Sequence, residues 1–294
     1  KELEPGLNAL FGLEYKRYEN QHSEIYNEES SDRAFEEEVM LSGFANAQVK
    51  GEGSGVSFDE AQETFTARYT HETVALAFAI TEEAIEDNLY DRLASRYTKA
   101  LARSMSNAKQ VKSVEPLIQG LPTTNNFDSG DGVSLFNTAH PTVAGTFANT
   151  LATQADLNET SLEQSMIDIA QMTDERGLRI AARGVKMIIP SELQFTAERL
   201  MKSQGRTGTA DNDINAIVSM GMVPQGYRVN NYLTDSDAFY ILTDIPNGMK
   251  MFNRAPLTTA MEGDFDTGNV RYKARERYSF GVSDPRGIFG VEGA

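Results

Sequence analysis

The sequence predicts an α+β protein in which one long helix accompanies long strands from distant parts of the chain. Residues 81–112 carry apolar side chains at helical spacing, whereas residues 64–80 and 269–282 show the two-residue period of strands. Hydrophobic residues make up 40% of the 294 residues, so the chain can bury a sizeable core. A chain of this length corresponds to about two domains.

The first 45 residues predict a solvated, partly flexible arm. The first 80 residues contain 16 acidic and 6 basic residues, which is most of the excess charge of a chain whose formal charge is −16. Runs of charge are usually solvated. The alternative is an arm that docks onto a partner through five apolar or aromatic side chains: Phe11, Leu13, Tyr15, Tyr18 and Phe35.

Residues 46–80 predict two extended segments around a flexible, glycine-rich turn at Gly51–Gly55. Phe65, Ala67 and Tyr69 alternate with polar residues, and Val74–Ile80 continues the period of two. An isolated two-stranded ribbon is marginally stable in water and leaves its edges unpaired. We therefore expect either the rest of this chain or another copy to cover the ribbon.

Residues 81–112 predict the longest helix. Thr81 is a suitable N-cap, acidic residues occupy the first turns and basic residues the later ones, as the helix dipole favours. Leu93, Leu101 and Met105 belong to one apolar stripe. At about 1.5 Å per residue the helix is roughly 48 Å long, which indicates a structural spine.

Shorter elements are predicted for the remainder of the chain. They are a loop-like segment at 115–150, a helix capped by Asp156 or Thr160 and ending before Gly177, a strand at 185–189 that leads into Pro190, a short helix capped by Ser191, and a strand at 239–242.

The last long strand, 269–282, places four cations on one face: Arg271, Lys273, Arg275 and Arg277. One interpretation is pairing with acidic residues elsewhere. The other is a stripe that faces another subunit or nucleic acid. The net charge argues against extensive binding to nucleic acid, because it repels phosphates at long range.

No catalytic, cofactor or metal site is predicted. The chain has no cysteine, which excludes disulfides, thiolate zinc sites and cysteine nucleophiles. Nucleophile-elbow, P-loop, zinc-protease and dinucleotide motifs are absent. Asp211–Asn215 begins like a calcium loop, but Ala216 and Met222 replace the glycine and glutamate that such a loop needs. His140 is expected to be structural and His71 to be a cross-strand partner.

The sequence contains no predicted membrane span or secretory signal. Its longest apolar run is Val74–Ile80, whereas a spanning helix needs about 20 residues. No basic start followed by an apolar stretch and a small-residue cleavage site is visible.

Motifs spread along the chain resemble the major capsid proteins of tailed bacteriophages, which have the Hong Kong 97-type fold, and more narrowly the Mu-like major head subunit family. The segments that carry the resemblance are Thr66–His71, Ile80–Tyr90, Thr138–Thr142, Gly145–Phe147, Asp174–Leu178, Ile189–Phe195, Asp264–Asp266, Glu276–Gly281 and Asp284–Gly287. Their order and spacing together carry more weight than any one of them.

The resemblance implies an N-terminal arm, an extended hairpin loop, a peripheral domain with the spine helix, and an axial domain around five- and six-fold positions. The implied boundaries are 1–45 for the arm, 46–79 for the loop, 80–178 with 250–286 for the peripheral domain, and 179–249 with 287–294 for the axial domain. In such a shell the hairpin lies across a neighbouring subunit.

The implied function is an icosahedral shell around the double-stranded DNA of a tailed phage, assembled in the bacterial cytoplasm from hexamers and pentamers. Implied partners are a portal, a scaffold or protease, decoration proteins and weakly held DNA. The alternative is an encapsulin-like bacterial nanocompartment with protein cargo. A carboxylate-based hydrolase is the disfavoured third hypothesis.

Eight residues are candidates for contacts between subunits. They are Lys50, Glu52, Phe65, Arg68, Tyr69, Arg271, Lys273 and Arg275. Some relatives crosslink subunits through Lys and Asn side chains; Lys50 lies in the corresponding region, but the sequence identifies no partner for it.

Overall fold

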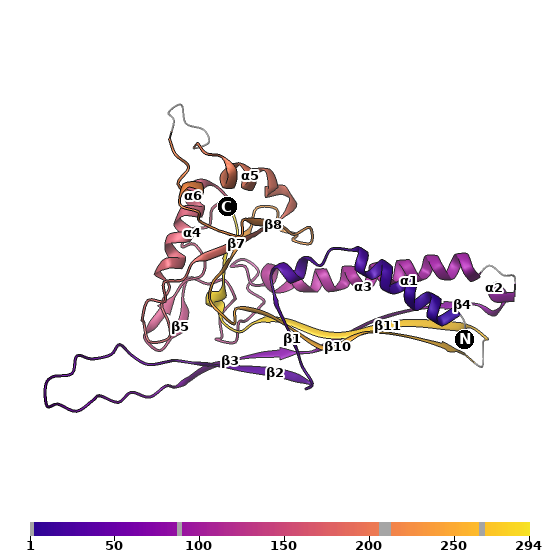
Figure 1. The fold of residues 1–294 in the computed structure, drawn as a ribbon, viewed down its shortest axis with the longest axis horizontal. Coiled ribbons are helices and arrows are strands. Elements are labelled where there is room, and N and C mark those ends of the chain that lie inside the picture. The colour runs from indigo at the N-terminus through magenta and orange to yellow at the C-terminus, as the bar shows by residue number, and fades with distance from the viewer. Residues whose placement is uncertain (1–2, 87–89, 206–212, 265–267) are drawn as a thin grey trace. The chain divides into compact units, whose positions relative to one another are not determined.

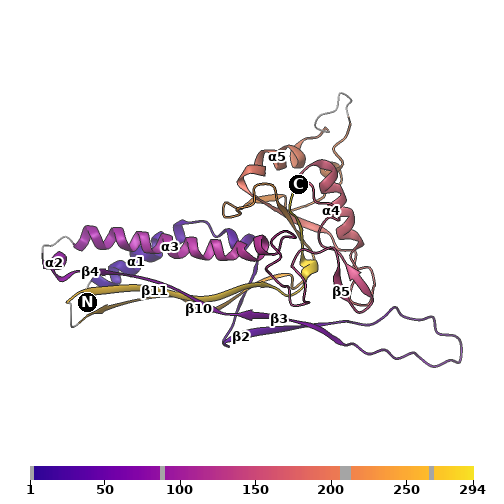
Figure 2. The same ribbon diagram turned by 180° about the vertical axis from the view of Figure 1, so that it is seen from behind.

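The chain folds into two compact units. The computed structural model describes residues 3–86, 90–205, 213–264 and 268–294. Unit 1 comprises Lys1–Glu36, Tyr69–Ser113 and Met251–Phe280, and unit 2 comprises Glu37–Arg68, Val114–Lys250 and Gly281–Ala294. Figures 1 and 2 show the elements from opposite sides.

Unit 1 is built on a four-stranded sheet. Its strands, in spatial order, are β1 (Asn27–Ser30), β10 (Met249–Gly263), β11 (Val270–Val282) and β4 (Glu72–Ile80). β4 runs antiparallel to β11, with Ile80 opposite Val270 and Glu72 opposite Tyr278. The strands predicted at 74–80 and 269–282 are therefore confirmed, and they are neighbours although about 200 residues separate them.

Two helices, α1 (Leu3–Arg17) and α3 (Tyr90–Gln119), run along one side of this sheet in both views (Figures 1 and 2). Alternation along β11 turns Tyr272 and Ala274 toward these helices, where they pack with Phe11 and Leu101. The cationic residues of β11 consequently point to the opposite side of the sheet.

The prediction of a solvated arm is wrong for much of the N-terminal segment. Phe11 is only 2% exposed, and Leu7, Ile25 and Tyr26 are also buried within unit 1. A short 3₁₀ turn, η1 (Gln21–Glu24), connects α1 to β1. Phe11 therefore packs inside its own chain and is not a docking group, whereas Leu13 remains exposed.

The predicted spine helix is present but has different bounds. The structure has α2 (Glu82–Glu86) and α3, while the part of the prediction at 87–89 lies outside the described residues. α3 continues past 112 and includes Pro116 in its last turn. Val114 and Leu117 are buried there, so packing outweighs the backbone hydrogen bond that the proline cannot make.

Unit 2 contains a mixed sheet. Its strands, in spatial order, are β12 (Ile288–Val291), β9 (Phe239–Thr243), β7 (Gly184–Ile189) and β8 (Tyr227–Val229). β8 is parallel to β7, whereas β9 is antiparallel to both β7 and β12. The strands predicted at 185–189 and 239–242 are confirmed.

Three helices contribute to the core of unit 2: α4 (Glu159–Gln171), α5 (Gln194–Lys202) and α6 (Ala216–Ser219). Asn158, and neither Asp156 nor Thr160, caps α4, because its side chain accepts a hydrogen bond from the Ser161 backbone in a capping box. Ser191 starts a 3₁₀ turn, η2 (Ser191–Leu193), and does not cap α5.

A separate two-stranded sheet pairs β2 (Phe35–Leu41) with β3 (Glu63–Thr70). The predicted hairpin therefore exists, but its first strand precedes residue 46, and residues 42–62 form the connecting loop without strand structure. The predicted continuous alternation breaks at His71, because β3 and β4 join different sheets. The remaining elements of unit 2 are β5 (His140–Thr142), β6 (Gly145–Phe147) and η3 (Pro285–Gly287).

Candidate assembly surfaces

The loop 42–62 extends from β2 and β3 as a long projection (Figure 1). Ser42 N–H donates to Gln62 O over 2.8 Å and closes its base. The Asp59 carboxylate accepts from Ala45 N–H at 2.7 Å, and backbone hydrogen bonds from Ala45 and Glu60 lower the pKa of Asp59. The loop thus has an ordered base and an extended tip.

Exposed apolar side chains occur on both halves of this loop. Val49 is fully exposed, and on the returning half Val56 is 68% and Phe58 97% exposed. Lys50 and Glu52 lie near the middle of the loop and are also exposed. Three large apolar side chains exposed within ten residues make this loop a candidate for contacts with another molecule.

The three candidates on β3 have different environments. Phe65 is half-buried and lines a cleft of about 340 Å³ in unit 2. Arg68 is exposed and lies 3.8 Å from Glu37 on β2. Tyr69 is buried, with its ring 4.8 Å from that of Phe252. The Tyr69 side chain is therefore not accessible to another subunit in the isolated chain, whereas Arg68 is accessible.

The cationic row on β11 is confirmed as a geometric feature for three of its four predicted members, whereas Arg277 is half-buried. Arg271, Lys273 and Arg275 are exposed, while the residues between them are buried. Arg271 forms an ion pair with Asp264. The register places small side chains beside the row, with Ala79, Ala77 and Ala75 of β4 opposite these three residues in turn. A role in subunit contacts remains a prediction.

A buried ionic network holds the C-terminal segment of unit 2. The Arg286 guanidinium lies 2.6 Å from Glu175 and 3.3 Å from Asp284, and it donates to Thr173 O at 2.8 Å. It also lies over the Phe147 ring at 4.2 Å. Sequence reasoning did not single out Arg286 or Glu175, although both belong to motifs quoted above, Asp284–Gly287 and Asp174–Leu178.

His140 is structural, as predicted, and occupies a second buried network. Its Nδ1 lies 2.6 Å from the Asp131 carboxylate and its Nε2 lies 3.0 Å from Asn149 Oδ1. Asn149 Nδ2 donates to Leu135 O and Pro285 O, so its oxygen must face His140. Burial would raise the pKa of Asp131, but the hydrogen bond from His140 and its other partners lower it. The network ties β5 to the C-terminal segment.

In unit 1 a cluster of titratable groups attaches the N-terminal segment to α3 and β11. Tyr15 donates to Glu276 at 3.3 Å, and Lys109 lies 3.5 Å from the same carboxylate. Burial raises the pKa of Glu276, although Lys109 opposes the shift. His22 is buried beside Gln110, at 3.1 Å. Burial, and then the charge of Lys109, lower the pKa of His22.

His71 is a cross-strand partner, as predicted. Its Nδ1 lies 2.9 Å from Ser279 Oγ on β11, and its Nε2 lies 2.9 Å from Ser31 Oγ. Burial and the nearby charge of Arg277 lower the pKa of His71. The side chain therefore bridges strands where β3 gives way to β4.

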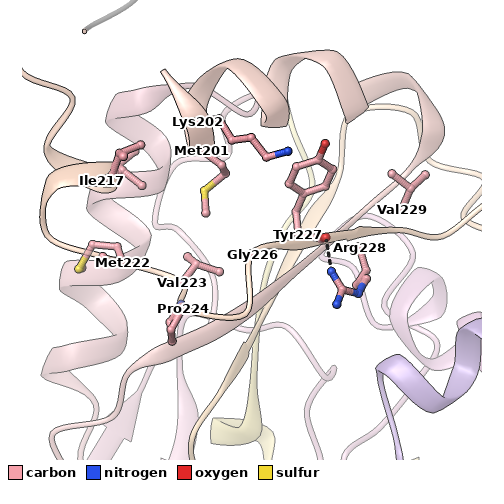
Figure 3. A pocket seen from close by; sticks show the side chains of 12 residues that line it. Met201, Lys202, Ile217, Met222, Val223, Pro224, Gly226, Tyr227, Arg228 and Val229 are labelled. Carbon is pink, nitrogen blue, oxygen red and sulfur yellow. Dashed lines mark hydrogen bonds between the residues drawn. The ribbon is translucent and has the colours of Figure 1, made fainter. Parts of the chain in front are cut away.

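A cavity of about 550 Å³ lies between α5, α6 and β8 (Figure 3). Its lining combines apolar side chains such as Met201, Ile217 and Val223 with Lys202 and Arg228. Lys202 forms an ion pair with Glu198 at 2.7 Å. The Glu198 carboxylate also accepts a hydrogen bond from the Tyr227 hydroxyl at 2.6 Å. The described residues that line this cavity include no serine, threonine, cysteine, histidine, aspartate or glutamate.

No group of three or more metal-ligating side chains occurs in the described residues. The calcium-like segment begins at Asp211 and Asn212, which lie outside them. None of the helices in the described part of the chain combines the length and apolar composition that a membrane crossing requires.

Comparison with known proteins identifies the family. Residues 63–291 match the phage capsid protein family. The chain belongs to this family. No curated protein sequence matches it. The match includes β3, the spine helix, both long strands of unit 1 and both buried networks of unit 2, so the capsid family accounts for most of the described fold.

Solved structures share the fold at low sequence identity. A virus-like particle from Pyrococcus furiosus is 10% identical, with 98% of each chain covered and a TM-score of 0.56. The capsid of Myoviridae phage XM1 is 12% identical over 92% of this chain and 89% of that chain, with a TM-score of 0.55. A structure from Mycobacterium phage Ogopogo is 13% identical over 94% and 92%, with a TM-score of 0.52.

These similarities confirm the predicted α+β fold of the Hong Kong 97 type and the prediction of a phage capsid protein. Such a protein is a structural component that self-assembles into the virion capsid. The narrower resemblance to the Mu-like head subunits and the four-part division of the chain remain predictions.

Proposed function

We propose that the chain is the major head subunit of a tailed phage and forms an icosahedral shell of hexamers and pentamers around double-stranded DNA. The single observation that carries this proposal, beside family membership, is the exposed loop 42–62 with the apolar side chains of Val56 and Phe58 on its returning half. A neighbouring copy of the chain can bury these apolar side chains and remove them from water. The loop then lies across that neighbour.

The four-part division fits this role as a proposal: arm 1–45, loop 46–79, peripheral domain 80–178 with 250–286, and axial domain 179–249 with 287–294. Assembly takes place in the host cytoplasm, with a portal and a scaffold or protease, and decoration proteins can bind the finished shell. The net charge of −16 supports only weak contact with packaged DNA, because a repulsive wall permits packing and release. We also propose that the subunit is not an enzyme.

The second candidate is a nanocompartment shell that encloses protein. It is favoured by one observation, the similarity in fold to the virus-like particle from Pyrococcus furiosus. Purified particles distinguish the two candidates. A phage head contains DNA that resists nuclease until the shell is opened, whereas a nanocompartment contains cargo protein and no protected DNA.

Shortening the loop tests the proposed shell. Replacing residues 46–57 with a short glycine-serine linker keeps the Asp59–Ala45 and Ser42–Gln62 contacts at the base. We expect a folded, soluble subunit that forms no closed particles by negative-stain electron microscopy. The control replaces Ala47 with Ser, an exposed position in the same segment, and leaves the length and the exposed Val49, Val56 and Phe58 unchanged; it should form normal particles. Normal shells from the shortened chain would contradict the role of the loop.

A further inference from the structure

The outer edge of β4 is an uncharged strand edge. β4 is the last strand of its sheet and pairs only with β11 among the described residues. From Thr73 to Ile80 it contains no charged residue, no proline and no glycine. Natural proteins usually protect such an edge with charges, proline or a cover, because its free backbone groups invite another strand.

The two faces of β4 differ in chemistry. Val74 and Phe78 point to the helix side, where Phe78 packs against Tyr97 with ring centroids 5.6 Å apart. Leu76 shares that side but is 47% exposed, so apolar surface continues to the edge. The opposite face has exposed alanines, including Ala77, and beyond them the cationic row of β11.

The loop 42–62 contains a segment with the complementary pattern. Val56 and Phe58 alternate with Ser57 and Asp59 in an extended, exposed stretch. Placed beside β4, this stretch can turn Val56 and Phe58 toward Leu76, while the small, uncharged Ser57 falls on the face of the alanines and the cationic row. Asp59 stays at the base of its own loop, where it accepts from Ala45 N–H and lies 3.7 Å from Arg176.

We propose that residues 55–58 of one copy add as a strand to the free edge of β4 in a second copy. The inference rests on the proposed function and specifies how the loop attaches. Backbone hydrogen bonds supply attachment, and alternate side chains supply the register. Because loop and edge are different surfaces, the contact is heterologous and links each subunit to two others. Pairing of β4 with another β4 would be isologous and would stop at dimers.

Disulfide trapping tests the proposal in a chain that has no cysteine of its own. Phe58→Cys is combined in turn with Val74→Cys, Leu76→Cys and Phe78→Cys, which lie on the apolar side of β4. Matched controls combine Phe58→Cys with Ala75→Cys, Ala77→Cys and Ala79→Cys on the other face. Assembled particles are mildly oxidised and separated without reductant, since directly opposed residues on paired strands approach within disulfide distance.

We expect at least one apolar-side pair to give a ladder of covalent multimers, and the opposite-face pairs to give none. Normal particles without a ladder would overturn the proposal but leave the proposed shell intact. A monomer band with changed mobility would indicate a disulfide within one chain, so that the loop pairs with β4 of its own chain. Dimers from Leu76→Cys alone would indicate that β4 pairs with a second β4. Either outcome would overturn the proposal. If the parent chain forms no particles, the proposed function itself fails.

A second variant covers the case in which the cysteine pairs prevent assembly. Leu76→Lys puts a charge at the free edge, where the side chain is already half exposed, so we expect a folded subunit. Shell yield should fall at least tenfold. The control is Ala260→Lys, an exposed position on β10, which should leave the yield unchanged. Normal assembly of Leu76→Lys would contradict strand addition.

Discussion

Replacing Arg286 with methionine should destabilise unit 2 strongly. The side chain is buried and provides a partner for Glu175, itself buried, as well as a donor to Thr173 O. Methionine fills similar space but leaves the Glu175 carboxylate unpaired. Removing one partner of a buried ion pair costs about 3–5 kcal/mol. For a domain of this size, that lowers the melting temperature by about 10 °C.

Urea unfolding of the unassembled subunit, followed by circular dichroism, measures this loss. The matched control is Arg183→Met, because Arg183 is exposed and should lose less than about 1 kcal/mol. In the double variant Glu175→Met/Arg286→Met the Glu175 charge is removed as well. Asp284 still loses its ion pair with Arg286 but keeps the hydrogen bond from the Arg286 backbone N–H, so the double variant should recover part of the stability. A loss below about 1 kcal/mol for Arg286→Met, or a double variant no more stable than the single one, would refute this reasoning.

Two further predictions concern unit 1. Leu101→Asp should unfold the subunit, because Leu101 is 3% exposed and the new charge would be buried without a partner; circular dichroism would detect the loss of structure. Leu93→Asp changes a half-buried position and should destabilise the subunit less. Equal effects of the two substitutions would contradict the packing. Because burial lowers the pKa of His22 below its usual 6.5, the unfolded chain binds the proton more readily, and stability is lost as the pH falls below 6.5. Glu276 has the opposite sign, because its raised pKa favours the folded state on acidification. His22→Gln isolates the first effect: its urea midpoint should fall less than that of the parent between pH 7.5 and pH 5.5, and equal falls would argue against it.

The elements that the sequence predicted best are those with long, regular periodicity. β11 and most of the spine helix follow from alternation and from the apolar stripe, because each has one buried side along most of its length. The N-terminal helix α1 was missed because only two of the apolar side chains described in it, Leu7 and Phe11, are buried, and the polar and acidic residues between them obscure the helical period. β10 was missed as well, although it is the central partner of β11.

The candidate surfaces were predicted to different degrees. The exposed cationic row on β11 follows directly from strand alternation, and the flexible tip of the loop follows from its glycines. The burial of Tyr69 could not be predicted, because its cover, Phe252, comes from a strand about 180 residues away. The pairing of Glu175 with Arg286 has the same character, since only the folded chain brings the two motifs together.

The sequence by itself determined the fold class, the spine, the long strands and the resemblance to phage capsid proteins, since periodicity and local motifs are properties of neighbouring residues. Only the tertiary structure decided that α1 packs inside unit 1, that β3 and β4 belong to different sheets, and that β4 has a free edge. These features depend on contacts between residues far apart in the chain, and local patterns do not specify which distant surface will cover a given side chain.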